Sequence, residues 1–298
     1  MFEGFASVEI DTGAARIFAR RAGSGPPVLL LHGFPETHLM WRDIAPRLAE
    51  THTVVCADLR GYGRSGCPES TPDHAAYSKR ALATDMLALM DQLGFSRFAV
   101  AGHDRGGRVA QRLALDAPDR IDALAMLDII PVSDAWDRAD DRLALAFWPW
   151  SLLAQPAPLP ETILVRCGEA IVANAAANWG SANAIPERVQ KEYAAMLQDG
   201  MHAHAICEEY RAAASIDRDH DRRDREAMQK ITCPALALWS AAGSLATWYE
   251  AEGGPLAIWQ RWCCDVKGWP VNGGHFFPEE KPKETADALS SFLQRPNS

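Results

Sequence analysis

The sequence predicts an α/β fold in which a mostly parallel β-sheet carries helices on both faces. Short apolar runs such as Val28–Leu31 have the composition of strands that are buried on both faces. They alternate with segments such as Tyr77–Leu93, where apolar residues recur at the period of an amphipathic helix. The same alternation of strands and helices occurs before and after the middle of the chain, so we expect both parts to form one sheet. Such a sheet binds ligands at the carboxyl ends of its strands.

The first expected element is a hairpin of Val8–Ile10 and Ile17–Arg20, with its turn at residues 11–13. The helix Tyr77–Leu93 is followed by Gly94, a residue type that is common just past a helix C-terminus. The other expected elements are strands at Val28–Leu31, Thr53–Ala57, Arg97–Ala101, Ala123–Leu127 and Ala235–Trp239, and helices at Gly107–Ala117 and Lys283–Leu293.

The middle of the chain lacks clean strand signals. From about Pro131 to Arg225 tryptophans accumulate, and no strand pattern appears. We therefore predict a helical cap of residues 131–225, inserted into an α/β core of residues 1–130 and 226–298. Within it, the charge-rich segment Asp217–Glu226 is expected to be a solvated helix or loop.

The bulk composition narrows the range of functions. The 298 residues carry a formal net charge of −9, which disfavours nucleic acid as a partner because phosphate binding needs a basic surface. The N-terminus lacks the basic and apolar regions of a signal peptide, and the early apolar run Val28–Leu31 is far too short to span a bilayer. The seven cysteines show no paired-ligand spacing, so we expect free thiols in a cytoplasmic protein. We also expect no metal, no cofactor and no membrane partner.

The segment Gly102-His103-Asp104-Arg105-Gly106 has the pattern of a nucleophile elbow, a sharp turn that lifts one side chain clear of the sheet. Small residues two positions before and after the centre permit this turn. Esterases place serine at the centre, whereas here the centre is Asp104. A carboxylate is a competent attacker of a saturated carbon that bears a leaving group, and it then forms an ester that water hydrolyses. The alternative is a structural aspartate in the first turn of a helix.

A histidine and a second carboxylate complete the predicted site. His275 follows the last strand signal, near Val271, and the chain order nucleophile, acid, histidine is the order that this kind of elbow requires. We expect His275 to deprotonate the water that attacks the ester. Asp128 directly follows the strand Ala123–Leu127, whereas no acid follows Ala235–Trp239 at once. The alternative for Asp128 is a helix N-cap.

Three further residues are predicted to bind negatively charged groups, either the ester oxyanion or the substrate carboxylate. Phe34 follows a buried strand, and its backbone N–H can point at the ester oxyanion together with the N–H of Arg105. Arg105 follows the nucleophile, and Arg108 lies one helical turn further on the same face. Two guanidinium groups beside Asp104 can bind a substrate carboxylate and offset its repulsion by the nucleophile. The alternatives are a simple turn at Phe34 and surface ion pairs for the arginines.

Four segments, in this order and spacing, resemble the α/β-hydrolase group of epoxide hydrolases and dehalogenases. They are His32–Pro35, Asp58–Gly63, Gly102–Arg108 and Gly274–Phe276. More narrowly, the two arginines of the elbow and the segments 127–131, 153–158 and 209–212 resemble the fluoroacetate (haloacetate) dehalogenase family. The resemblance implies an α/β-hydrolase fold and hydrolytic dehalogenation of small 2-haloacids, with Asp128 as the acid and both arginines on the substrate carboxylate. It also allows a homodimer.

The same resemblance implies a halide pocket made by a His-Trp pair and a tyrosine. Trp150 and Tyr210 match, but Pro149 stands where the family often has histidine. Because proline has no side-chain donor, we expect chloroacetate and bromoacetate to be handled better than fluoroacetate. Trp148 or Trp179 could supply an indole N–H instead. Two other functions stay open, namely an epoxide hydrolase, which usually needs two cap tyrosines, and a non-catalytic ligand-binding protein of the same fold.

Overall fold

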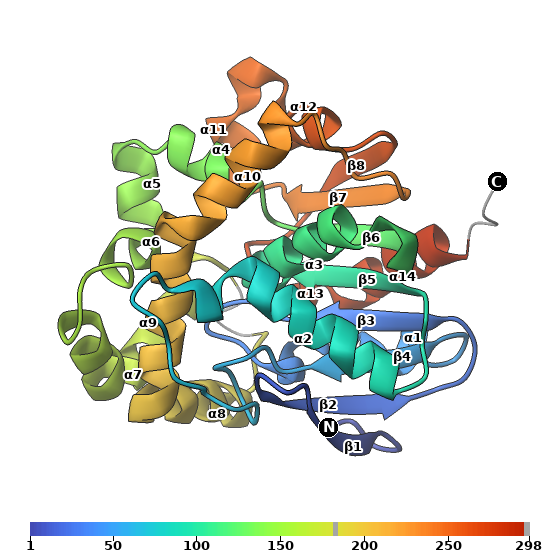
Figure 1. The fold of residues 1–298 in the computed structure, drawn as a ribbon, viewed down its shortest axis with the longest axis horizontal. Coiled ribbons are helices and arrows are strands. Elements are labelled where there is room, and N and C mark those ends of the chain that lie inside the picture. The colour runs from blue at the N-terminus through green and yellow to red at the C-terminus, as the bar shows by residue number, and fades with distance from the viewer. Residues whose placement is uncertain (181–183, 295–298) are drawn as a thin grey trace.

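The computed structural model describes residues 1–180 and 184–294, and its centre is an eight-stranded sheet (Figure 1). The strand order is β1-β2-β4-β3-β5-β6-β7-β8. Strand β1 pairs antiparallel with β2, and β2 pairs antiparallel with β4, whereas every later pair is parallel. The strands are β1 (Ala6–Asp11), β2 (Arg16–Ala22), β3 (Pro27–Leu31), β4 (Thr53–Ala57), β5 (Phe98–His103), β6 (Ile121–Leu127), β7 (Ala235–Ser240) and β8 (Val266–Val271). The predicted α/β class is confirmed.

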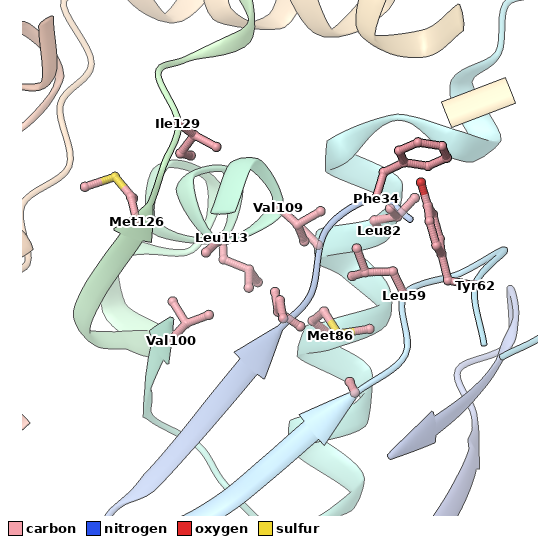
Figure 2. Packing of buried hydrophobic residues seen from close by; sticks show 14 of the residues in the cluster. Phe34, Leu59, Tyr62, Leu82, Met86, Val100, Val109, Leu113, Met126 and Ile129 are labelled. Carbon is pink, nitrogen blue, oxygen red and sulfur yellow. The ribbon is translucent and has the colours of Figure 1, made fainter. Parts of the chain in front are cut away.

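Neighbouring side chains of the central strands alternate between two apolar layers. On β3, Leu29 and Leu31 belong to the cluster that contains α2 and α3 residues, whereas Val28 and Leu30 belong to the cluster with α1 and α14. Figure 2 shows part of the first cluster, where Met86 of α2 lies beside the sheet. The helices of the two layers are α1 (Ala45–Leu48), α2 (Lys79–Gln92), α3 (Asp104–Asp116) and α14 (Pro282–Leu293). Burial on both faces explains why the strands read as continuous apolar runs.

Between β6 and β7, the part of the chain that the structure describes contains only helices. These are α4 (Val132–Asp137), α5 (Asp141–Ala146), α6 (Trp148–Leu152), α7 (Leu159–Asn178), α8 (Glu187–Gln198), α9 (Gly200–Ala214) and α10 (Ile216–Glu226), called the helical insertion below. Figure 1 shows α5 to α9 gathered beside one end of the sheet. The division into a core of residues 1–130 and 226–298 and a cap of residues 131–225 stays a proposal.

The charged helix α10 differs from its prediction as a solvated segment. Asp221 and Asp224 are buried and accept hydrogen bonds from Arg112 of α3 at 2.9 and 2.6 Å. Asp217 is also buried and accepts from the backbone N–H of Lys79 at 2.9 Å. One side of α10 is therefore buried and forms ion pairs and hydrogen bonds with α2 and α3, which pack on the sheet. A run of charges does not reveal this in the sequence, because the partners come from distant segments.

Several short elements connect the larger ones. They are η1 (His38–Trp41), η2 (Ala75–Tyr77), η3 (Pro118–Arg120), α11 (Ser244–Trp248), η4 (Glu250–Glu252), α12 (Gly254–Trp262) and α13 (Phe277–Glu280). All seven cysteines are free, as predicted. Within residues 1–180 and 184–294, none of the helices has the length and apolar character needed to cross a membrane.

Candidate active site

Asp104 lies at the sharp junction of β5 and α3. Its φ is 43°, in the left-handed region that residues with a side chain rarely adopt. A Cβ atom on Gly102 would lie 2.3 Å from the carbonyl oxygen of Gly106, and one on Gly106 would lie 2.4 Å from that of His32. Neither position has room for a side chain. Close backbone approach therefore dictates the small residues on both sides of Asp104.

The carboxylate of Asp104 is buried and holds a hydrogen bond on each oxygen. The backbone N–H of Phe34 donates to Oδ2 at 3.1 Å, and Nη1 of Arg108 donates to Oδ1 at 2.9 Å. Burial alone would raise the pKa of Asp104, but Arg108, His275 and Arg105 together hold this pKa far below its usual range. The group is therefore ionised at neutral pH, which is the form that can attack an electrophile.

The fold brings His275 and Asp128 together across 147 residues of sequence. His275 Nδ1 lies 2.6 Å from Asp128 Oδ2, while Asp128 Oδ1 accepts from the backbone N–H of Ser240 at 2.8 Å. Since the carboxylate accepts the Nδ1 proton, the other ring nitrogen, Nε2, is left as a base. His275, Asp128 and Asp104 line the same cavity. The three residues thus have the arrangement that nucleophilic catalysis followed by hydrolysis would use.

His103, which flanks the elbow, belongs to a buried polar network that the sequence did not reveal. Its Nδ1 lies 2.9 Å from Glu36 Oε2, and its Nε2 lies 2.8 Å from the backbone oxygen of His275. Burial alone would lower the pKa of His103, but the Glu36 carboxylate outweighs this effect and raises it to about 9. A charged ring donates to both acceptors at once. His103 therefore holds the loop of His275 in place.

The two arginines occupy the site in different ways. Arg108 pairs with Asp104, whereas Arg105 is fully buried and pairs with Glu209 of α9, with Nε 2.7 Å from Oε2. Among the described residues, Arg105 Nη1 and Arg108 Nε are buried and have no hydrogen-bond partner. A buried donor without an acceptor is costly. Arg108 lines the cavity beside Asp104, so a bound anion would find a donor there, whereas Arg105 lies behind the residues that line this cavity.

The aromatic residues predicted to bind halide lie against the same guanidinium groups. The Cζ atom of Arg105 is 4.0 Å from the ring centre of Tyr210 and 5.5 Å from that of Trp150. Arg108 Cζ is 4.7 Å from the centre of Trp150. The alternative donor Trp179 is ruled out by its own contact, because its Nε1 already donates to the carbonyl oxygen of Ala146 at 2.8 Å. The residues predicted to bind the carboxylate are therefore in direct contact with those predicted to bind the halide.

A small cavity of about 20 Å³ lies against Asp104 and His275, which is room for about one water molecule. It is lined by Asp104, Arg108, Asp128, Ile130, Ala135, Leu143, Phe147, Trp150, Leu245, Trp248, Tyr249 and His275. Three of these, Leu245, Trp248 and Tyr249, come from the segment after β7 and were not predicted. No motif marks them, because they reach the site only through the packing of α11.

Comparison with known proteins agrees with the architecture. Residues 26–282 match the alpha/beta hydrolase fold family. The chain is 42% identical to a fluoroacetate dehalogenase from Burkholderia sp, over 98% of this chain and 95% of that protein. It is 32% identical to a soluble epoxide hydrolase from Corynebacterium sp. (strain C12), over 91% of each. Among solved structures, a protein from Nostoc sp PCC 7120 described as an alpha/beta hydrolase is 44% identical, with a TM-score of 0.95 over 99% of this chain and 100% of that chain.

Proposed function

This chain belongs to the alpha/beta hydrolase fold family, and on that premise we propose that it hydrolyses the carbon–halogen bond of small 2-haloacids such as chloroacetate. The observation that carries the proposal is an ionised carboxylate, Asp104, whose pKa is lowered by two arginines that each have one buried nitrogen without a partner, Nη1 of Arg105 and Nε of Arg108. Similarity to a fluoroacetate dehalogenase over nearly the whole chain supports the same reaction class. A substrate carboxylate would supply charged acceptors for both donors, which an uncharged substrate would not.

In the first step, the substrate carboxylate binds Arg105 and Arg108, and an oxygen of Asp104 attacks the carbon that bears the halogen. The electrons of the carbon–halogen bond leave with the halide, and an ester with Asp104 forms. Oδ1, which faces Arg108, is the attacking oxygen, because Oδ2 then keeps its bond from the Phe34 N–H. Trp150 and Tyr210 receive the halide.

In the second step, His275 takes a proton from a water molecule, and the resulting hydroxide attacks the ester carbonyl carbon. Asp128 orients the ring through Nδ1 and stabilises its charged form. The negative charge on the carbonyl oxygen is stabilised by the backbone N–H groups of Phe34 and Arg105. Collapse expels the alkoxide, which takes back the proton held by His275 and leaves as the 2-hydroxyacid. The carboxyl group of Asp104 then loses its proton to solvent and is restored as the carboxylate.

The test is to incubate the chain with chloroacetate and to measure chloride and glycolate. Equal amounts of the two products are expected, and the Asp104→Asn variant should give neither. Chloride release by that variant at the parental rate would refute the proposal.

Epoxide hydrolysis is the second candidate, and one specific contact favours it. Tyr249 lines the cavity beside Asp104, so together with Tyr210 it could supply the two tyrosine hydroxyls that such chemistry uses, and burial raises the pKa of both. Tyr193 does not serve, because its hydroxyl lies 3.4 Å from Oε1 of buried Glu279. Incubation with a small neutral epoxide separates the candidates, since turnover of the epoxide without chloride release from chloroacetate would favour the epoxide hydrolase.

A further inference from the structure

Glu209 is a buried carboxylate whose partner is Arg105, one of the two arginines proposed to bind the substrate carboxylate. It lies on α9 of the helical insertion and is fully buried, as is its partner Arg105. Nε of Arg105 lies 2.9 Å from Oε1 and 2.7 Å from Oε2, and Nη2 lies 2.7 Å from Oε2. One whole edge of the guanidinium is therefore occupied by Glu209, and Nη1 is left without a partner.

A second ion pair holds Glu209 in turn. Lys79, at the start of α2, contacts Oε1 of Glu209 through its ammonium group. The same ammonium lies 3.5 Å from Asp217 Oδ2, while the Lys79 backbone N–H donates to Asp217 Oδ1. The four side chains are at most 3% exposed. Burial and the charge of Arg105 lower the pKa of Lys79, so this link contributes its contacts rather than a full charge. A chain of buried contacts thus runs from Asp217 through Lys79 and Glu209 to Arg105, and it holds Glu209 on the side opposite Arg105.

The charge of Arg105 also acts on the nucleophile that precedes it in the chain, because it helps to lower the pKa of Asp104. Asp104 already accepts from Arg108 through Oδ1 and from the Phe34 N–H through Oδ2. A guanidinium free to turn would pair with Asp104 as well, because charge-assisted bonds are strongest in a buried site. Such a pair would occupy the donors meant for the substrate and would weaken the nucleophile.

From these contacts we infer that Glu209 is a positioning residue, which holds Arg105 off Asp104 and presents Nη1 to the substrate carboxylate. The inference deepens the proposed function and rests on it. It predicts that Glu209 sets both the affinity for the carboxylate and the preference for acids over uncharged haloamides. Since α9 belongs to the helical insertion, the insertion would decide which substrate charge the core accepts.

The test compares Glu209→Gln with Glu208→Gln, a matched change one position earlier on α9. Glu208 is also buried but bonds Arg211 at 2.7 Å and His74 at 2.7 Å rather than Arg105. For Glu209→Gln, kcat/KM for chloroacetate should fall by about tenfold or more, with KM raised, because one partner of a buried pair is lost. Turnover of chloroacetamide, which has no carboxylate, should change little in either variant. Equal behaviour of both variants towards both substrates would overturn the inference.

A double variant covers the case in which Glu209→Gln does not fold. Arg105→Gln with Glu209→Gln removes both charges of the pair, which is tolerated better than removing one. If Glu209 acts through Arg105, the double variant should have the same KM for chloroacetate as Arg105→Gln alone. A further rise in KM would show that Glu209 acts by another route and would contradict the inference.

Binding of glycolate separates this inference from the proposed reaction. Trp150, one of ten tryptophans, lies beside both arginines, so the tryptophan fluorescence of the chain should change when glycolate binds without turnover. Weaker glycolate binding in Glu209→Gln but not in Glu208→Gln supports the role of Glu209, even if the parent chain releases no chloride. If the parent chain releases chloride but glycolate binding is unchanged in Glu209→Gln, the role of Glu209 is wrong and the proposed function stands.

Discussion

Replacing His275 with asparagine should separate the two halves of the proposed reaction. Asparagine keeps an N–H that can donate to Asp128 Oδ2, which now lies 2.6 Å from His275 Nδ1, so the buried carboxylate is not left unpaired. The base is lost, however, because an amide does not accept a proton from water at neutral pH. Asp104 stays ionised, since Arg108 and Arg105 still hold its pKa below the usual range.

The size of the effect follows from which step loses its catalyst. A general base contributes about 10²–10⁴-fold, so hydrolysis of the ester on Asp104 should slow by that factor. Attack by Asp104 needs only the nucleophile and the arginines, and it should remain fast. We therefore expect about one chloride per chain in a rapid burst, followed by slow turnover.

The assay is rapid mixing with chloroacetate, followed by chloride measurement and intact-protein mass spectrometry. The chain should gain about 58 Da, the mass of a carboxymethyl group that replaces a proton, and peptide mapping should place it on Asp104. Asp104→Asn serves as the control and should show neither burst nor adduct. Steady turnover of His275→Asn at the parental rate, or an adduct on another residue, would refute the mechanism.

Three further predictions follow from other parts of the structure. The folded-state pKa of His103 is raised to about 9 from the ordinary 6.5, so its stabilisation is present below pH 6.5 and is lost as pH rises through 9. The free energy of unfolding should therefore fall by about 3 kcal/mol between these two pH values. Urea unfolding at both pH values should detect this loss, and an equal loss in His103→Gln would contradict the assignment to His103. Pro149→His should raise the ratio of fluoroacetate turnover to chloroacetate turnover by about fivefold, because the histidine adds one hydrogen bond to the departing halide. Pro149→Ala should leave this ratio unchanged. The same ratio in both variants would count against a halide donor at this position. Gly106→Ala should destabilise the fold by about 3 kcal/mol, because the added Cβ atom would lie 2.4 Å from the His32 carbonyl oxygen. Gly200→Ala should have little effect, because a Cβ atom at Gly200 would meet no atom within 4 Å. Comparable denaturation midpoints for the two variants would disprove the claim that crowding at the elbow excludes a side chain.

Much of the candidate site was predictable because its residues stand at strand ends. Asp104 and Asp128 directly follow β5 and β6, and parallel strands end at the same edge of a sheet. His275 comes soon after β8 in the same way. The sequence therefore predicted that these three side chains would be close together, and the structure places His275 Nδ1 2.6 Å from Asp128 Oδ2. Their catalytic roles remain a proposal.

The sequence was less informative where a role depends on a partner from a distant segment. Glu209 attracted notice only as part of a family motif, yet its carboxylate meets Arg105, which lies 104 residues away. Trp179 looked free to bind a halide, but the Ala146 carbonyl takes its indole N–H. Tyr249 gave no signal at all, although it lines the cavity.

The sequence by itself determined the layered α/β architecture, the elbow with its carboxylate, and the order of the three candidate catalytic residues. These features depend on local apolar patterning and on backbone crowding, which neighbouring residues specify. The tertiary structure decided which charges are neutralised, which donors stay free, and that one side of α10 is buried. Burial and ion pairing are long-range properties, because a charged side chain can leave water only when the fold brings a partner to it.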